Sequence, residues 1–275
     1  MKRKMMIILA AAFAAIFLFS GMILWRDYRD QEASAEVFDS VAELILMETQ
    51  PVMESHAEDA GTQPTESTEP SAVEMTAYEK YAAVYAQNND FVGWLWIEGT
   101  DINYPVMQTP EEPNYYLKRA FDRSYSDYGV PYVQENCALG ISDNIVIYGH
   151  NMSNGSMFAD LCRYEKKSFW EEHPIIHFDT LSGYGDYEIV TVFKTVAYSQ
   201  EGFKYYHFVD AESEVDFDAF LAQCMELELY DTGVDAKYGD QLITLSTCEY
   251  SRKNGRMVIV AKKIVPPAAE VDGDA

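Results

Sequence analysis

The sequence predicts a mainly β domain, either a closed β-barrel or a β-sandwich, with helices packed on its outside. Strand-like runs recur from Tyr132 to Ile264, two shorter helical stretches interrupt them, and no internal repeat divides the chain. Two further strand-like runs precede residue 110, so we expect six to eight strands. A chain of 275 residues with 48% apolar residues can bury one sizeable core and still carry extensions.

The N-terminus predicts a membrane anchor. Lys2, Arg3 and Lys4 precede an uncharged apolar run, residues 5–25, which ends at Trp25. A helix of this length spans roughly 30 Å, the hydrocarbon thickness of a bilayer. The positive charges before it place the N-terminus in the cytoplasm and the rest of the chain outside. A cleaved signal peptide is the alternative, but the run is long for one and no small-x-small cleavage site follows, so we favour an uncleaved anchor.

A stalk is expected between the anchor and the folded domain. Residues 27–50 show a weak amphipathic pattern that indicates a helix. Residues 51–75 are rich in Pro, Ser, Thr, Glu and Gly, a composition that cannot bury enough surface to fold. The predicted division is residues 1–26 as cytoplasmic tip and transmembrane anchor, 27–75 as acidic extracytoplasmic stalk, 76–265 as folded domain and 266–275 as disordered tail.

Order returns at Thr76. The stretch AYEKYAAVYAQ predicts a helix, and FVGWLWIEG and DINYPVMQ predict two strands around a Gly-Thr turn. The later strands are expected at YVQ, NIVIYGH, IIHFD, YEIVTVFKTVAY, QLITLSTC and RMVIVAKKI. The two intervening helical stretches are SMFADLCRYEKKSFWEEH and VDFDAFLAQCMELELY.

Charge and cysteine content exclude several function classes. The formal net charge of -25 leaves no basic surface to displace counterions from phosphates, so we expect no nucleic-acid partner. Part of this charge belongs to the stalk, because residues 31–75 contain eleven Asp or Glu and no Lys or Arg. The four cysteines form no CxxC pair, which disfavours a zinc knuckle or a thioredoxin-type motif, and we expect them to be mostly reduced.

Two histidines have a spacing that could suit a metal. His173 and His177 are four residues apart, which on a helix would place both side chains on one face. Pro174 and the β-branched residues after it instead predict the start of a strand, where the two side chains diverge. We therefore expect no metal site there.

The most reactive stretch is QLITLSTCEYSRKNGRMVIVAKK, residues 241–263. Cys248 lies at the end of one predicted strand and Arg256 at the start of the next. If the strands pair, a sulfur nucleophile lies beside a fixed cation, an arrangement that suits acyl transfer. On this stretch alone, a buried core cysteine and a solvated hairpin arginine are the favoured alternative. His150, which ends the strand NIVIYG after Gly149, supplies the third reactive group in the same exported domain.

NIVIYGHNMSNGSMF together with TLSTCEYSRKNGRMVIVAKK resembles the sortases, cysteine transpeptidases of Gram-positive cell surfaces. The TLSTC form, the helix after the histidine and the N-terminal anchor resemble class B in particular. The resemblance covers roughly residues 78–265. It implies an eight-stranded β-barrel with an N-terminal helix and a helix, matched by VDFDAFLAQCMELELY, between the sixth and seventh strands.

The resemblance also implies roles for individual residues. Cys248 would be the nucleophile, His150 the general acid and base, and Arg256 the residue that positions the substrate and stabilises the oxyanion. Arg252 lies in the turn between Cys248 and Arg256 and is the alternative guanidinium. The positions that match the groove for the sorting signal are Leu117, Tyr148, Tyr205, Tyr206, Ser246 and Glu249, and Thr247, also expected to bind substrate, would add a hydroxyl or backbone amide to the oxyanion hole.

The implied activity is the cleavage of a C-terminal sorting motif, NPQT-like or NPKT-like, after Thr or Ser. A thioacyl-enzyme would form and pass the protein to a cell-wall peptide amine. The implied partners are surface proteins with a sorting signal, the peptidoglycan cross-bridge amine and, through residues 5–25, the cell membrane. The reaction needs neither a metal nor an organic cofactor.

Three rival functions stay under consideration. A papain-like hydrolase would place its Cys before its His and on a helix, and neither holds in this sequence. A pilus-polymerising sortase would join a pilin lysine, and a compact lid before the barrel would favour it. A catalytically idle surface-binding module would lack Cys, His or Arg, whereas all three are present.

Overall fold

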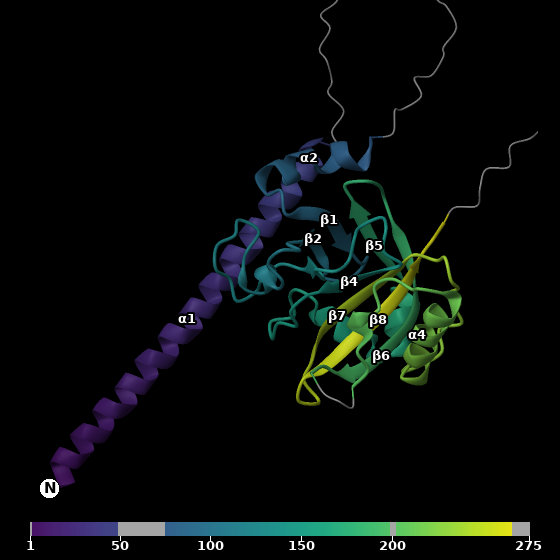
Figure 1. Cartoon of the computed structure of the whole chain (residues 1–275). Coiled ribbons are helices and arrows are strands. Elements are labelled where there is room, and N and C mark those ends of the chain that lie inside the picture. Colours follow the sequence, from purple (N-terminus) through teal and green to yellow (C-terminus); the bar gives the residue numbers. More distant parts are fainter. Residues whose placement is uncertain (1, 49–74, 199–201, 266–275) are drawn as a thin grey trace, which may run out of the picture.

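The computed structural model describes residues 2–48, 75–198 and 202–265, and its centre is a closed barrel (Figure 1). The predicted stretch at 51–75, apart from Met75, and the tail at 266–275 lie outside the described residues. The strands are β1 (Phe91–Trp96), β2 (Asn103–Met107), β3 (Tyr132–Val133), β4 (Asn144–Tyr148), β5 (Ile175–Thr180), β6 (Asp186–Val196), β7 (Leu242–Glu249) and β8 (Gly255–Lys263). Around the barrel they follow the order β1-β2-β3-β4-β7-β8-β6-β5, so the expected eight-stranded barrel is confirmed.

The strand pairing brings the ends of strands that are far apart in sequence to the same end of the barrel. β4 and β7 run parallel, with Tyr148 opposite Ser246. β7 and β8 form an antiparallel hairpin that stays in register along its whole length, from Leu242 opposite Lys262 to Glu249 opposite Gly255. The C-terminal ends of β4 and β7 and the start of β8 therefore lie together.

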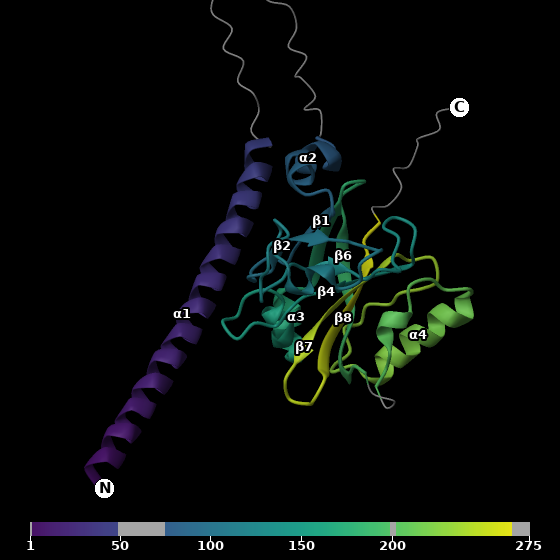
Figure 2. The ribbon, with the colours of Figure 1, turned by 60° about the vertical axis from the view of Figure 1, so that its left-hand side comes forward.

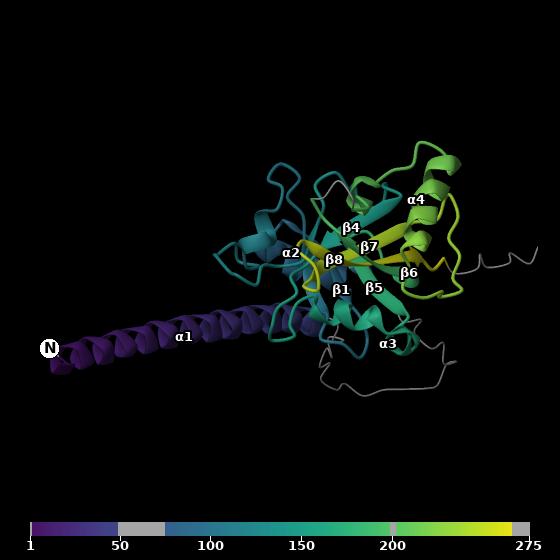
Figure 3. The same cartoon turned by 90° about the horizontal axis from the view of Figure 1, so that it is seen from below.

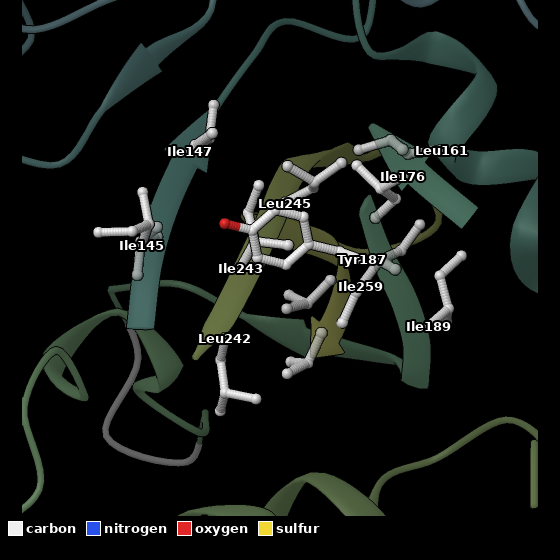
Figure 4. Packing of buried hydrophobic residues seen from close by; sticks show 14 of the residues in the cluster. Ile145, Ile147, Leu161, Ile176, Tyr187, Ile189, Leu242, Ile243, Leu245 and Ile259 are labelled. Carbon is white, nitrogen blue, oxygen red and sulfur yellow. The ribbon is translucent and has the colours of Figure 1, made fainter. Parts of the chain in front are cut away.

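The barrel interior is filled by branched aliphatic and aromatic side chains. Figure 4 shows Ile145 and Ile147 of β4 facing Ile243 and Leu245 of β7, with Ile259 of β8 beside them. All five are buried. Removing such a side chain from water stabilises the fold by roughly 1.5–3 kcal/mol, so this shared core holds the three strands that carry the reactive residues in fixed register.

Helices cover the outside of the barrel. They are the α-helices α1 (Lys2–Glu48), α2 (Ala77–Gln87), α3 (Lys167–Glu172) and α4 (Glu214–Glu226), and the 3₁₀ helices η1 (Tyr115–Lys118), η2 (Ala159–Glu165) and η3 (Tyr205–His207). α2 starts in a capping box, in which the Thr76 side chain accepts from the Glu79 N–H and Glu79 accepts from the Thr76 N–H. α4 packs against β6, on the opposite side of the barrel from α1 (Figure 2).

The helical stretch after His150 divides into η2 and α3. Lys166 lies between them with an extended backbone, at φ -102° and ψ 125°, so the chain does not continue as one helix. The helix expected between the sixth and seventh strands is α4, which follows β6 and precedes β7.

α1 joins the predicted anchor and the predicted amphipathic helix in one element without a break at residue 26. Its N-terminal part projects from the barrel (Figure 3), and it is the one described helix whose length and composition would allow it to cross a membrane. Its C-terminal part packs on the barrel. The Phe38 ring lies 5.1 Å from that of Tyr104, the Ser34 and Ser126 hydroxyls are 3.2 Å apart, and Val41 is buried. Residues 34–41, which the sequence assigns to a stalk, therefore contact the folded domain.

Candidate active site

The strand register brings Cys248, His150 and Arg256 to one end of the barrel. Cys248 lies directly opposite Arg256 across β7 and β8. Tyr148 lies opposite Ser246 in the parallel pair of β4 and β7, so His150 and Cys248, each two residues further along, reach the same level. All three side chains line one groove of about 500 Å³.

Nine of the ten site residues expected from the sequence line this groove. Besides the three reactive residues they are Leu117, Tyr148, Tyr205, Tyr206, Ser246 and Thr247. Glu249 is the exception. Its carboxylate accepts hydrogen bonds from the N–H and hydroxyl of Ser251 and lies 3.7 Å from the Lys194 ammonium, away from the groove. These partners hold the pKa of Glu249 below its usual value despite its partial burial.

His150 is positioned by a backbone partner from another part of the chain. Its Nε2 lies 2.8 Å from the carbonyl oxygen of Leu117, at the end of η1. Burial lowers the pKa of His150 below 6.5, and the Leu117 carbonyl opposes that shift. Gly149 gives the backbone room before His150, since a Cβ there would lie 2.5 Å from the Phe158 ring. The strand end therefore needs glycine at residue 149.

The backbone around Cys248 is tied to the turn that follows His150. The Asn151 side-chain amide donates to the Cys248 carbonyl oxygen at 2.8 Å, and the Thr247 hydroxyl donates to the Gly149 carbonyl at 2.8 Å. The same carbonyl of Cys248 lies 3.7 Å from the Cys162 sulfur. These bonds link the end of β7 to the end of β4, which holds the Cys248 backbone beside the turn that carries His150. All four cysteines are free thiols.

Arg256, not Arg252, provides the guanidinium of the groove. Its Nη1 donates to the Gly255 carbonyl at 2.9 Å, and the group lies 5.8 Å from the centre of the Tyr198 ring. No carboxylate among the described residues forms an ion pair with it, so its charge is available to a bound ligand. Arg252 lines a different cavity, beside Lys194.

Tyrosine rings form the walls of the groove. The Tyr205 and Ser246 hydroxyls are 2.5 Å apart, and burial raises the pKa of Tyr205 to about 12. The ring of Tyr205 meets that of Tyr206 edge to face at 5.3 Å. Tyr132 and Tyr148 lie 5.5 Å apart between ring centres. Flat apolar walls with hydroxyl groups along them suit an extended peptide.

The groove includes residues that were not among the ten expected site residues. They are Asn114, Val130, Tyr132, Gln134, Glu135, Asn136, Gly149, Ala197, Tyr198 and His207. Tyr132 could have been found by pairing the YVQ strand with NIVIYG, because Tyr132 lies opposite Tyr148. Gly149 and His207 lie next to the expected residues His150 and Tyr206. The remaining residues come from segments whose approach to the groove depends on tertiary contacts, for which the local sequence gives no signal.

The two histidines considered for a metal have other partners. His173 Nδ1 lies 2.7 Å from the Glu98 carbonyl, and His177 Nδ1 lies 2.7 Å from the Asp186 carboxylate. His177 also stacks on Trp96 at 4.7 Å between ring centres. These contacts of His173 and His177 stabilise the barrel.

The arrangement of groups in the groove suits acyl transfer. A thiol can attack a carbonyl, an imidazole can exchange the proton, and a cation without a carboxylate partner can stabilise the oxyanion. A Cys and a His on neighbouring strand ends, with a positioned third group, match the roles expected of nucleophilic catalysis.

Comparisons with known proteins agree with this chemistry. The model of the Sortase domain family matches residues 95–264. Sortase B of Staphylococcus aureus is 33% identical over 180 residues, which cover 64% of this chain and 71% of that protein. Sortase B of Listeria monocytogenes is 34% identical over 181 residues, with the same coverage of 64% and 71%. A solved Staphylococcus aureus sortase B-substrate complex superposes with a TM-score of 0.70 at 27% identity, covering 86% of this chain and 98% of that chain.

Proposed function

Because the chain belongs to the sortase family, as a class B cysteine transpeptidase that anchors surface proteins, we propose that Cys248, His150 and Arg256 form its catalytic set. The observation that carries the proposal is the strand register. Cys248 and Arg256 are a cross-strand pair, and His150 reaches the same level from the parallel strand β4. The ladder hydrogen bonds of two strand pairs thus fix three reactive groups at one end of the groove.

In the first step, the Cys248 thiolate attacks the carbonyl carbon of the Thr or Ser before the scissile bond. The carbonyl oxygen becomes an oxyanion, which the guanidinium of Arg256 stabilises. The carbon–nitrogen bond then breaks, the sulfur–carbon bond of a thioester remains, and protonated His150 gives its proton to the leaving amine nitrogen. The thiolate is favoured when His150 and Arg256 are both charged.

In the second step, an amine attacks the thioester and releases Cys248. Neutral His150 accepts the proton that the attacking amine loses, so the enzyme returns to its starting state. The proposed acceptor is the amine of a cell-wall peptide cross-bridge. Splitting one amide exchange into two acyl transfers lowers the barrier of each step.

The proposed substrate is a C-terminal sorting motif of the NPQT or NPKT type on a surface protein. Leu117, Tyr148, Tyr205, Tyr206 and Ser246 line the groove on which such a segment would lie. The Staphylococcus aureus sortase B structure is a complex with substrate, which supports a peptide-binding role for the corresponding groove.

The proposed topology places the catalytic domain on the outer face of the cell membrane. Residues 5–25 form the span, with the N-terminus in the cytoplasm. The guanidinium of Arg29 lies 4.8 Å from the centre of the Trp25 ring, a pairing suited to the membrane–water boundary. The proposed division of the chain is 1–26 as tip and anchor, 27–75 as stalk, 76–265 as catalytic domain and 266–275 as tail.

The full chain in detergent micelles, mixed with fluorogenic NPQT, NPKT and LPxTG peptides, tests the proposal. Wild type should cleave an NP-type peptide, Cys248→Ala should cleave none, and added triglycine should appear covalently in the product. Lack of cleavage by wild type, or cleavage that persists in Cys248→Ala, would contradict the proposed function. Incorporation of a lysine side chain in preference to triglycine would indicate pilus polymerisation, and peptide binding without cleavage would indicate an idle binding module.

A further inference from the structure

Glu135 supplies the one carboxylate that lines the groove, within the described part of the chain. The side chains of the groove that can carry a positive charge are Arg256, His150 and His207. Glu135 is half-exposed, and no described side chain forms a hydrogen bond or an ion pair with it. A carboxylate on the wall of a peptide-binding groove, without a partner from the protein, is available to a cation on the ligand.

The turn that carries Glu135 is held firmly on both sides. The Gln134 side-chain oxygen accepts from the Asn136 N–H at 3.2 Å, and the Gln134 amide donates to the Tyr206 carbonyl at 3.0 Å. Gln108 donates to the Gln134 carbonyl at 3.2 Å. Gln134 thus connects the turn to the tyrosine wall of the groove, so the position of the Glu135 backbone relative to that wall is fixed.

The register gives the distance from Glu135 to the nucleophile along the groove. Tyr132 lies opposite Tyr148, which lies opposite Ser246, and the Gln134 N–H continues the ladder to Val146. Gln134 is therefore four residue levels from Cys248, towards the start of β7, and Glu135 follows it in the turn. Four levels at about 3.3 Å each are roughly 13 Å, so the turn lies within the reach of four to five extended peptide residues.

The chemistry of the intermediate decides which part of the substrate lies on Glu135. The thioester keeps the segment N-terminal to the scissile bond, whereas the C-terminal segment leaves as an amine. The groove that extends from Cys248 must therefore hold the N-terminal segment until the acceptor arrives. β4, β7 and β8 lie side by side (Figure 1), and the lining of the groove includes both Glu135 and the reactive residues at the strand ends.

We propose that Glu135 makes the enzyme select sorting signals with a Lys or Arg side chain within the five residues that precede the scissile bond. This inference rests on the proposed transpeptidase function and adds the charge of the substrate to it. An ion pair at a half-exposed carboxylate contributes up to about 1 kcal/mol, equivalent to a preference of about fivefold in kcat/KM. The preference should decline in high salt, because screening weakens exposed charge pairs.

A lysine scan of the substrate with the full chain in detergent micelles tests the inference. Peptides carry Lys, Gln or Glu at each of the positions two, three, four and five residues before the scissile bond, so NPKT and NPQT form one matched pair. The enzymes are wild type, Glu135→Gln, Glu135→Lys and the control Glu171→Gln. Glu171 is an exposed carboxylate on α3 that does not line the groove, so its variant makes the same charge change elsewhere.

We expect wild type and Glu171→Gln to prefer Lys about fivefold over Gln at one position at least. Glu135→Gln should lose this preference because its kcat/KM falls more for the Lys peptide than for the Gln peptide. Glu135→Lys should disfavour Lys and accept Glu at the same position. Equal rates for Lys and Gln at every position, or a Lys preference that persists in Glu135→Gln, would overturn the inference while leaving the proposed function intact. An equal loss for Lys and Gln peptides in Glu135→Gln would also overturn it, since Glu135 would then act on the fold. If wild type cleaves none of the peptides, the proposed function itself fails.

Discussion

Cys248 and Arg256 face each other as a cross-strand pair, one residue before the end of β7 and one residue after the start of β8. The hairpin between them is closed by a hydrogen bond of 3.1 Å from the Gly255 N–H to the Arg252 carbonyl. The position of the guanidinium relative to the sulfur therefore follows from ladder register and does not depend on a mobile loop. The same turn directs Arg252 to another cavity.

This relationship predicts different outcomes for the two arginines. Arg256→Ala should lower kcat/KM about 100-fold to 1000-fold, because the oxyanion loses its charged partner. Arg252→Ala should change kcat/KM by less than about twofold, because an exposed charge outside the groove contributes little. Steady-state cleavage of an NPQT peptide measures both. A larger loss for Arg252→Ala than for Arg256→Ala would reverse the assignment.

Burial of His150 predicts the pH at which it titrates. Since burial lowers its pKa, the imidazole should titrate below pH 6.5 in the folded protein. As the pH falls below 6.5, the unfolded chain takes up this proton before the folded chain does, so the contribution of neutral His150 to stability is lost in that window. NMR titration of the imidazole in Cys248→Ala, assigned with His150→Gln, measures the midpoint. A midpoint above 6.5 would contradict the burial argument.

The close approach at Gly149 predicts a steric requirement next to the catalytic histidine. A Cβ at residue 149 would lie 2.5 Å from Phe158, so Gly149→Ala should cost about 1–3 kcal/mol and displace His150. Gly183→Ala is the matched control, since a Cβ there meets nothing within 4 Å. The melting temperature and the rate of peptide cleavage should both fall for Gly149→Ala and stay unchanged for Gly183→Ala. Equal effects of the two substitutions would count against this role of Gly149.

The buried end of α1 predicts that the anchor helix is part of the folded unit. Val41 is 1% exposed and packs in one cluster with Tyr81, Val84 and Trp94. Val41→Ala should cost about 2 kcal/mol and speed amide hydrogen exchange in residues 34–45. Val215→Ala on α4 removes the same atoms from a side chain that is 74% exposed and should change neither. Unchanged exchange in Val41→Ala would show that this part of α1 is not held by the barrel.

Much of the barrel could be predicted from the sequence because its strands carry strong local patterns. MVIVA in β8 and NIVIY in β4 are β-branched runs with polar breaks after them, and such runs indicate buried strands. The closed barrel of eight strands came from the resemblance to a family, and the order of the strands around it was not predicted, since pairing between distant segments leaves no local pattern. The split between η2 and α3 at Lys166 was missed because the apolar spacing on both sides fits one helix.

The reactive residues of the site were predictable because each lies at the end of a strand that local patterns define. Cys248 and His150 end the strand-like runs QLITLSTC and NIVIYGH, so the ends of their strands were visible in the sequence. Glu135 was not singled out, because its place in the groove depends on the bond from Gln134 to Tyr206, which lies 72 residues further along the chain. Glu249 was expected in the groove, but hydrogen bonds to Ser251 direct its carboxylate elsewhere.

The most direct test of the catalytic set is to trap the thioacyl-enzyme on Cys248. The full chain is mixed with an NPQT or NPKT peptide without an amine acceptor, quenched in acid and weighed by intact-protein mass spectrometry. Wild type and the control Cys162→Ala should gain the mass of the N-terminal peptide fragment, peptide mapping should place it on Cys248, and hydroxylamine should remove it. An adduct that persists in Cys248→Ala, or cleavage by wild type with no adduct on Cys248, would contradict the account.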